Sequence, residues 1–233
     1  MSYPFNSSTP VALASEDVRA AFLVKVYQHL ALAVGAFVAF EVMLFMSGIA
    51  ERLLKFISGN QAGWLLILGG MMVANMIAST AASKVDSVPS QYGGLFLLAF
   101  AQALIFAPFL YLVLDGEGGA GTVQAAVAIT LLGFGALSVI AFTTKKDLSF
   151  LRPLIMWGGF IALGLVVLGV LGVLNLGVTF SLAMIGLAGA AILYQTQKIV
   201  REYPEWAYVA ASIALFVSLM TMFWYVLRLL SRR

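Results

Sequence analysis

The sequence contains no cysteine, one histidine and few charged residues, which make up 10% of its 233 positions. Without cysteine there can be no disulfide bond, thiolate metal site or cysteine nucleophile, and one histidine cannot build a multi-histidine metal site. The HExxH, P-loop and GxSxG motifs of metalloproteases, nucleotide-binding proteins and serine hydrolases are also missing. These absences predict a protein that is not an enzyme and has no catalytic residues, no cofactor and no firm metal site.

Long apolar runs fill most of the chain instead. Hydrophobic residues make up 62% of the sequence, well above their share in soluble domains, and a helix needs about 20 of them to cross the hydrocarbon core. The runs are continuous, whereas the strands of a membrane barrel are shorter and alternate in polarity. We therefore predict an all-α integral membrane protein with seven transmembrane helices, near residues 26–48, 62–82, 92–114, 121–142, 153–174, 177–198 and 205–228.

The N-terminal segment differs from the rest of the chain because it is polar and rich in proline and serine. It has no basic stretch ahead of a short apolar core, which argues against a cleaved signal peptide. Its composition predicts a disordered tail over residues 1–20, followed by one seven-helix transmembrane domain over residues 21–230. The connections between the spans are too short to hold a further folded domain.

The positions of lysine and arginine predict which ends of the spans face the cytoplasm. With a cytoplasmic N-terminus and seven crossings, eight of the 13 basic residues lie inside and five outside. The outer five include Arg228, Arg232 and Arg233, which fit this rule poorly. If one late segment re-entered instead of crossing, these three would move inside and the count would become eleven to two. We predict seven full crossings and leave the re-entrant alternative open.

Glu41 is the only carboxylate placed well inside a predicted span. An ionised carboxylate at this depth is costly, so Glu41 must be protonated, paired or in contact with water. One interpretation is a neutral side chain that bonds to a neighbouring helix or reaches the headgroups, and the other is a titratable gate or cation ligand. We weigh them equally, because intramembrane acids are functional by default but Glu41 lies within about 10 Å of the end of its span.

A seam of small and uncharged polar residues runs along the last two predicted spans. Helical spacing places Gln195 on one face of the sixth span, and Ser218 and Thr221 on one face of the seventh. Small residues let helices approach closely, and polar residues form interhelical hydrogen bonds worth about 0.6 kcal/mol each. Helix packing explains this seam, and the alternative is an ion path that combines it with Glu41.

Four short segments resemble one known family in their residues, order and spacing. They are VRAAFLVKVY at 18–27, AP at 107–108, TTKKDLSF at 143–150 and GLAGAAILYQTQK at 186–198. The last resembles the signature of the Bax inhibitor family, also called the transmembrane Bax inhibitor motif family. The segment at 143–150 and LFVSL at 215–219 are most similar to its bacterial YccA-like branch.

The resemblance implies an architecture, a location and two functions. The architecture is a bundle in which the last helix lies centrally between two three-helix layers, and the location is a bacterial inner membrane. Members of the family are associated with a pH-sensitive calcium leak and with restraint of cell death. The YccA-like branch is associated with binding and modulating a membrane-anchored ATP-dependent protease.

The calcium leak is attributed in the family to two aspartates, one in a Tyr-Asp-Thr-Gln-like motif on the sixth helix and one on the seventh. The motif positions here are Tyr194, Gln195, Thr196 and Gln197, and the second aspartate position is Ser218. Neither Gln195 nor Ser218 titrates near neutral pH. The resemblance therefore implies that the proton switch is missing at this seam, where calcium would bind only weakly without charge.

The leading hypothesis is a multi-pass inner-membrane protein that modulates a membrane-anchored ATP-dependent protease, or a membrane stress response, through protein contacts. The alternative is a pH-sensitive leak for calcium or another cation, with the aspartate pair replaced. The expected partners are the lipid bilayer, such a protease and, in the alternative, a cation. We expect no nucleic-acid partner.

Overall fold

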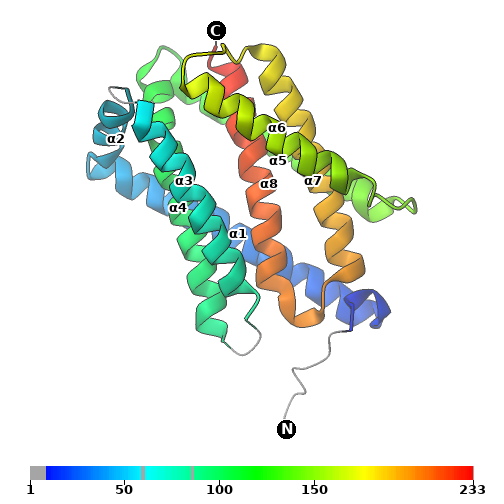
Figure 1. The fold of residues 1–233 in the computed structure, drawn as a ribbon. Helices are drawn as coiled ribbons and strands as arrows, with labels where there is room; N and C mark the ends of the chain where they lie inside the picture. The colour runs from blue at the N-terminus through cyan, green and yellow to red at the C-terminus, as the bar shows by residue number, and fades with distance from the viewer. Residues whose placement is uncertain (1–8, 59–60, 85–86, 233) are drawn as a thin grey trace.

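The computed structural model describes residues 9–58, 61–84 and 87–232, and within these ranges the regular elements are all helical (Figure 1). Seven of the helices are long and apolar enough to cross a membrane, which confirms the predicted all-α membrane protein. The elements are η1 (Val11–Leu13), α1 (Glu16–Met46), α2 (Ile49–Ser58), α3 (Gln61–Ala82), α4 (Val88–Asp115), α5 (Gly119–Thr143), α6 (Leu151–Val170), α7 (Val178–Glu202), η2 (Glu205–Ala207) and α8 (Tyr208–Leu230).

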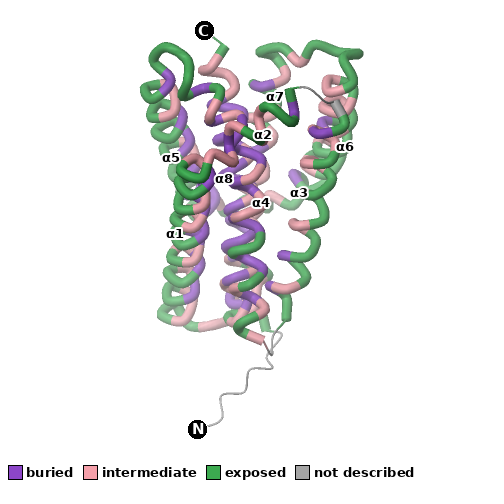
Figure 2. Tube along the Cα trace, turned by 90° about the vertical axis from the view of Figure 1, so that its left-hand side faces the viewer, coloured by how far each residue is buried: buried purple, intermediate pink, exposed green. Residues whose placement is uncertain are grey.

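The last helix, α8, forms the centre of the bundle (Figures 1 and 2). It packs against α1, α4, α5 and α7. In the most apolar stretch of the span Glu205–Leu230, 72% of the residues are buried. On one side of α8, α4 contacts both α1 and α3, and on the other side α7 contacts both α5 and α6. The outer helices α3 and α6 are the least buried, at 11% and 6%, so they offer most of their surface to lipid.

The chain forms helical structure earlier than the predicted tail over residues 1–20 allows. Residues 1–8 lie outside the described residues, but η1 begins at Val11 and α1 at Glu16. Two acidic residues, Glu16 and Asp17, occupy the first turn of α1, where the helix dipole stabilises negative charge. The segment before α1 is held by tertiary contacts: the Val11 N–H donates to the Tyr203 carbonyl over 2.8 Å, and Val11 is 1% exposed.

One helix, α2, lies in a connection that the sequence analysis treated as a loop. Its charged residues include Glu51 and Lys55, which form an (i, i+4) ion pair at 2.5 Å, while Ala50 and Ile57 are buried. A short helix with one apolar and one charged face suits the membrane interface. The ion pair lowers the pKa of Glu51 and raises that of Lys55, through their hydrogen bond first and their charges second.

The helix α6 ends at Val170, earlier than the predicted span 153–174. Gly172 adopts a left-handed backbone with φ of 75°. The N–H of Val173 donates to the Leu168 carbonyl and that of Gly172 to the Gly169 carbonyl. This is the Schellman arrangement, which closes a helix and favours glycine because it has no Cβ.

The two chain ends lie on opposite faces of the bundle (Figure 1). Both α7 and the segment Glu205–Leu230, which joins η2 to α8, are long enough to cross, with 25 and 26 residues, which supports seven crossings over the re-entrant alternative. We call the two faces the N-terminal face, near Ser15 and Tyr203, and the C-terminal face, near Leu176 and Arg232.

Candidate functional site

The three predicted seam residues line one cavity. Gln195 on α7 and Ser218 and Thr221 on α8 border a space of about 750 Å³, which we call the polar cavity. Asn75 and Ser79 of α3, and Ser83 just after the end of this helix, are further polar residues that line the same cavity. Lys198 and Glu202 line the end of the cavity near the N-terminal face. The periodicity of α7 and α8 therefore predicted a real cluster, and the structure adds a polar wall from α3.

The hydroxyl groups of this cavity are bonded within their own helix. Ser218 Oγ donates to the Ala214 carbonyl over 3.1 Å, and Thr221 Oγ1 donates to the Val217 carbonyl over 2.8 Å. The hydroxyl oxygens can still accept a bond or ligate a cation. Among the described residues, Gln195 makes no hydrogen bond, so its amide is free to meet a ligand, water or a partner.

Glu41 lies apart from this cavity. It is 7% exposed on the buried stripe of α1, between Phe37 and Leu44, and is not among the residues that line the polar cavity. Neither of its carboxylate oxygens has a hydrogen-bond partner among the described residues. The structure thus separates Glu41 from Gln195, Ser218 and Thr221, with which the ion-path hypothesis combined it.

Gln197, a family-motif position, is a structural clamp. Its Oε1 accepts the Leu148 N–H over 2.7 Å, and its Nε2 donates to the Lys146 carbonyl over 2.8 Å. These bonds hold the connection between α5 and α6 against α7. At the surface of that connection Asp147 lies 3.6 Å from Arg201, and hydrogen bonds from Ser149 hold the pKa of Asp147 below its ordinary value.

Replacing Gln197 with leucine is expected to lower the thermal stability of the protein. Gln197 is 6% exposed, and its replacement removes both of these hydrogen bonds and leaves the Leu148 N–H without its side-chain partner, at about 1–3 kcal/mol. Thermal unfolding of the purified protein in detergent measures the change. Gln195→Leu is the matched control, because Gln195 bonds to none of the described residues and should lose little. Equal losses in both variants would contradict the clamp.

A cluster of buried hydroxyl groups was missed by the sequence analysis. The Tyr27 hydroxyl on α1 lies near those of Ser138 on α5 and Thr196 on α7. Each of these oxygens is buried without a direct hydrogen bond among the described residues. Thr196 is a family-motif position, so the motif supplies a group to the polar cavity and another to this interior cluster. The signal is absent from the sequence because the three residues come from three separate helices.

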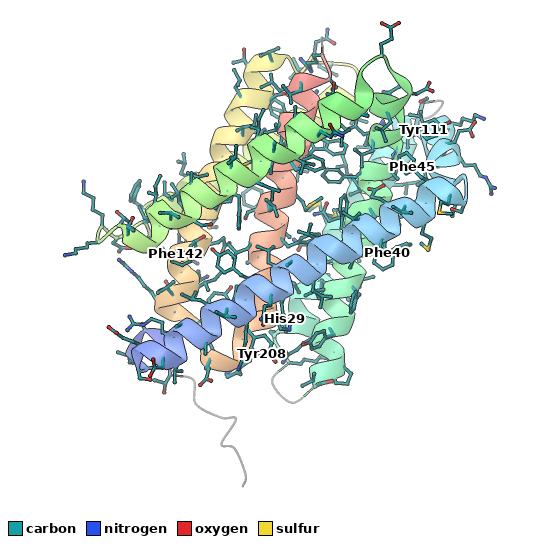
Figure 3. The ribbon with its side chains drawn as sticks, turned by 180° about the vertical axis from the view of Figure 1, so that it is seen from behind. His29, Phe40, Phe45, Tyr111, Phe142 and Tyr208 are labelled. Carbon is teal, nitrogen blue, oxygen red and sulfur yellow. The ribbon has the colours of Figure 1, made fainter. Side chains whose placement is uncertain are left out.

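His29 joins three helices at the N-terminal face. Its Nδ1 donates to the Lys25 carbonyl over 2.7 Å, so Nε2 accepts the Tyr92 hydroxyl over 2.6 Å. The Tyr208 ring lies 4.8 Å away between ring centroids, and Figure 3 shows the pair where α1 crosses the end of α8. His29 therefore ties α1 to α4 and α8.

A second and larger cavity adjoins the polar one. It has a volume of about 1000 Å³ and is lined mainly by apolar side chains of α3, α4, α6 and α8; we call it the apolar cavity. Both cavities border Gly159, Met184, Val217 and Thr221. Glu41 lines neither. Through the described part of the chain, no three His, Asp or Glu side chains are grouped as a metal site would require.

Comparison with known proteins places this fold in a family. The model of the family described as "Inhibitor of apoptosis-promoting Bax1" matches residues 19–233. YccA of Escherichia coli K12, named a modulator of FtsH protease, is 30% identical over 163 residues, which cover 69% of this chain and 71% of YccA. The same protein in another E. coli strain is named an inner membrane protein. An uncharacterized protein of Pseudomonas aeruginosa is 33% identical over 129 residues, covering 55% of this chain and 58% of that protein. The match to nearly the whole seven-helix domain means that this chain belongs to the Bax inhibitor family.

Proposed function

We propose that this protein modulates a membrane-anchored ATP-dependent protease from within the bacterial inner membrane, with its N-terminal face in the cytoplasm. The similarity to YccA, whose name is that of an FtsH protease modulator, carries the proposal. The relative is named for modulation and not for catalysis, in keeping with an activity exerted through protein contacts.

The N-terminal face has the features of a contact surface. The segment at Pro10 and Val11 docks onto the connection between α7 and α8, where Pro10 pairs with Pro204. The ordered connection held by Gln197 exposes Lys145 and Asp147 on the same face. Ordered polar segments beside an attached N-terminus support recognition by a cytoplasmic protease domain.

Affinity capture from native membranes tests this proposal. The full chain is expected to enrich an ATP-dependent membrane protease, identified by mass spectrometry. A variant without residues 1–9 should enrich less of it if this segment contacts the protease, because Val11 can still dock in its absence. Removing residues 1–17 should weaken capture further.

The matched control removes charge from the opposite face. Arg52→Gln with Lys55→Gln alters exposed residues of α2 on the C-terminal face and should leave capture unchanged. If neither the full chain nor the truncated chain enriches the protease, the proposed function is wrong. Equal capture by all variants would retain the partner but reject the N-terminal segment as the contact.

A second candidate function is a slow cation leak, favoured by the meeting of the two cavities at Thr221. Together the two cavities extend from Lys198 near the N-terminal face to Arg232 at the C-terminal face. Purified protein in calcium-loaded liposomes should then release calcium faster than empty liposomes. Glu41→Gln should reduce that release only if Glu41 acts as a gate away from these cavities. Release equal to that of empty liposomes would reject this function.

A further inference from the structure

The apolar cavity ends in two arginines at the C-terminal face. Arg228 and Arg232 line that end, and most of the remaining lining is apolar or aromatic, including Trp64 of α3 and Trp224 of α8. The two most exposed helices, α3 and α6, form its sides, so it lies where the bundle is most open to lipid.

Both arginines donate to one carbonyl oxygen. Arg228 Nη2 lies 3.2 Å from the Leu176 oxygen, and Arg232 Nη2 donates to the same atom. The Arg228 guanidinium also lies 5.9 Å from the centroid of the Phe180 ring. The guanidinium groups are thus held side by side at the cavity mouth by backbone and ring contacts.

Among the described residues these two cations have no negative partner. Throughout the described ranges neither forms a salt bridge, and no Asp or Glu lines the apolar cavity. Arg228 is half-buried, and two like charges repel more strongly where water is scarce. Each guanidinium carries five N–H donors, of which the Leu176 carbonyl occupies one, so this end of the cavity has donors to spare for an anion.

The cavity matches one leaflet in length. Arg228 lies eleven positions after Val217 along α8, which corresponds to about 16 Å of helix. One leaflet contributes about half of the roughly 30 Å hydrocarbon core. An acyl chain that enters with its headgroup at Arg228 would therefore end near Val217, where the apolar cavity meets the polar one.

We propose that the apolar cavity binds one anionic phospholipid, whose phosphate contacts Arg228 and Arg232 and whose acyl chain lies between α3 and α6. Arginine suits this role because its planar fork matches phosphate oxygens, and basic pockets between membrane helices bind lipid headgroups. A lipid bound here covers the most exposed side of α8 and fills the space next to Thr221. This also explains why arginines gather on the face opposite the proposed cytoplasmic one.

Native mass spectrometry of the purified full chain tests the proposal. The protein is incubated in detergent with phosphatidylglycerol, with phosphatidylcholine or with inorganic phosphate, and bound lipid is counted. We expect about tenfold preference for phosphatidylglycerol over phosphatidylcholine, lost in Arg228→Gln with Arg232→Gln. Arg52→Gln with Lys55→Gln removes the same charge from the same face, away from the cavity, and should keep the preference.

A second pair of variants tests the acyl-chain part of the cavity. A side chain added at Gly159 would enter open space bordering the cavity, so Gly159→Leu should reduce retention of both lipids. Gly164 on the same helix also has open space around it but does not line the cavity, so Gly164→Leu should leave lipid retention unchanged. Equal retention by the arginine pair variant and its control overturns the proposal. Thermal unfolding of the same samples is measured in parallel. If inorganic phosphate stabilises the protein as much as phosphatidylglycerol does, the site binds an anion without lipid, and the proposal is overturned.

Discussion

Replacing Gln195 and Ser218 together with aspartate is expected to create a calcium flux that depends on pH between about 5 and 8. Both residues line the polar cavity, so the two carboxylates would share one space. Two close carboxylates hold a proton in common because both cannot cheaply ionise, and they ligate calcium only once that proton has left. Calcium should therefore bind more tightly at the alkaline end of this range. Fluorescent calcium release from liposomes, measured across the range, records the effect.

The control for this variant is Gln195→Asn with Ser218→Asn, which places polar groups of the same size without a titratable proton. It should give a flux that does not change with pH. A double aspartate variant that folds but behaves like this control would contradict the assignment of Gln195 and Ser218 to the family's aspartate positions.

Replacing Glu41 with leucine is expected to stabilise the protein, by about 1–3 kcal/mol. The carboxyl group is buried and has no partner among the described residues, so its desolvation is not offset. Leucine has a similar volume and no polar atom, and such replacements of buried ionisable groups are often stabilising. Thermal unfolding in detergent, followed by tryptophan fluorescence, measures the change.

Two further variants serve as comparisons for the stability of Glu41→Leu. Glu41→Gln keeps a buried polar group and should gain less than Glu41→Leu, while Val42→Leu changes an exposed neighbour and should be neutral. Loss of stability in Glu41→Leu would mean that Glu41 is held by bound water or a cation, which favours the gate interpretation. Gln197→Leu is expected to change stability in the opposite direction, because the Gln197 amide already has hydrogen-bond partners.

The spans were predictable because each one is long, continuous and apolar, and the membrane leaves a helix as the way to satisfy its backbone. The helix α2 could not be predicted in the same way, because its ten residues, which include Glu51, Arg52 and Lys55, are too few and too polar for a span. The start of α1 was missed for a related reason. Residues 11–20 contain no apolar run long enough to predict a span, and their order depends on the contact between Val11 and Tyr203.

The seam was predictable in part. Helical periodicity places Ser218 and Thr221 on one face, and the structure brings Gln195 to the same cavity. Periodicity describes one helix at a time, so it could not say that Asn75 of α3 faces them or that Glu41 lies elsewhere. The same limit hid the pairing of Gln197 with the connection before α6.

Composition and run length alone determine that this chain is a seven-helix membrane protein, because the cost of exposing backbone and charge to lipid admits few other solutions. The short motifs add the family, and their resemblance predicts that its acidic pair is replaced by Gln195 and Ser218. The rotation and crossing of the helices decide which polar groups share a cavity. They also decide which groups hold two segments together and which have no partner. Those angles are set by side-chain packing between segments far apart in the chain. The convergence of Arg228 and Arg232 on Leu176 is therefore visible only in the folded bundle.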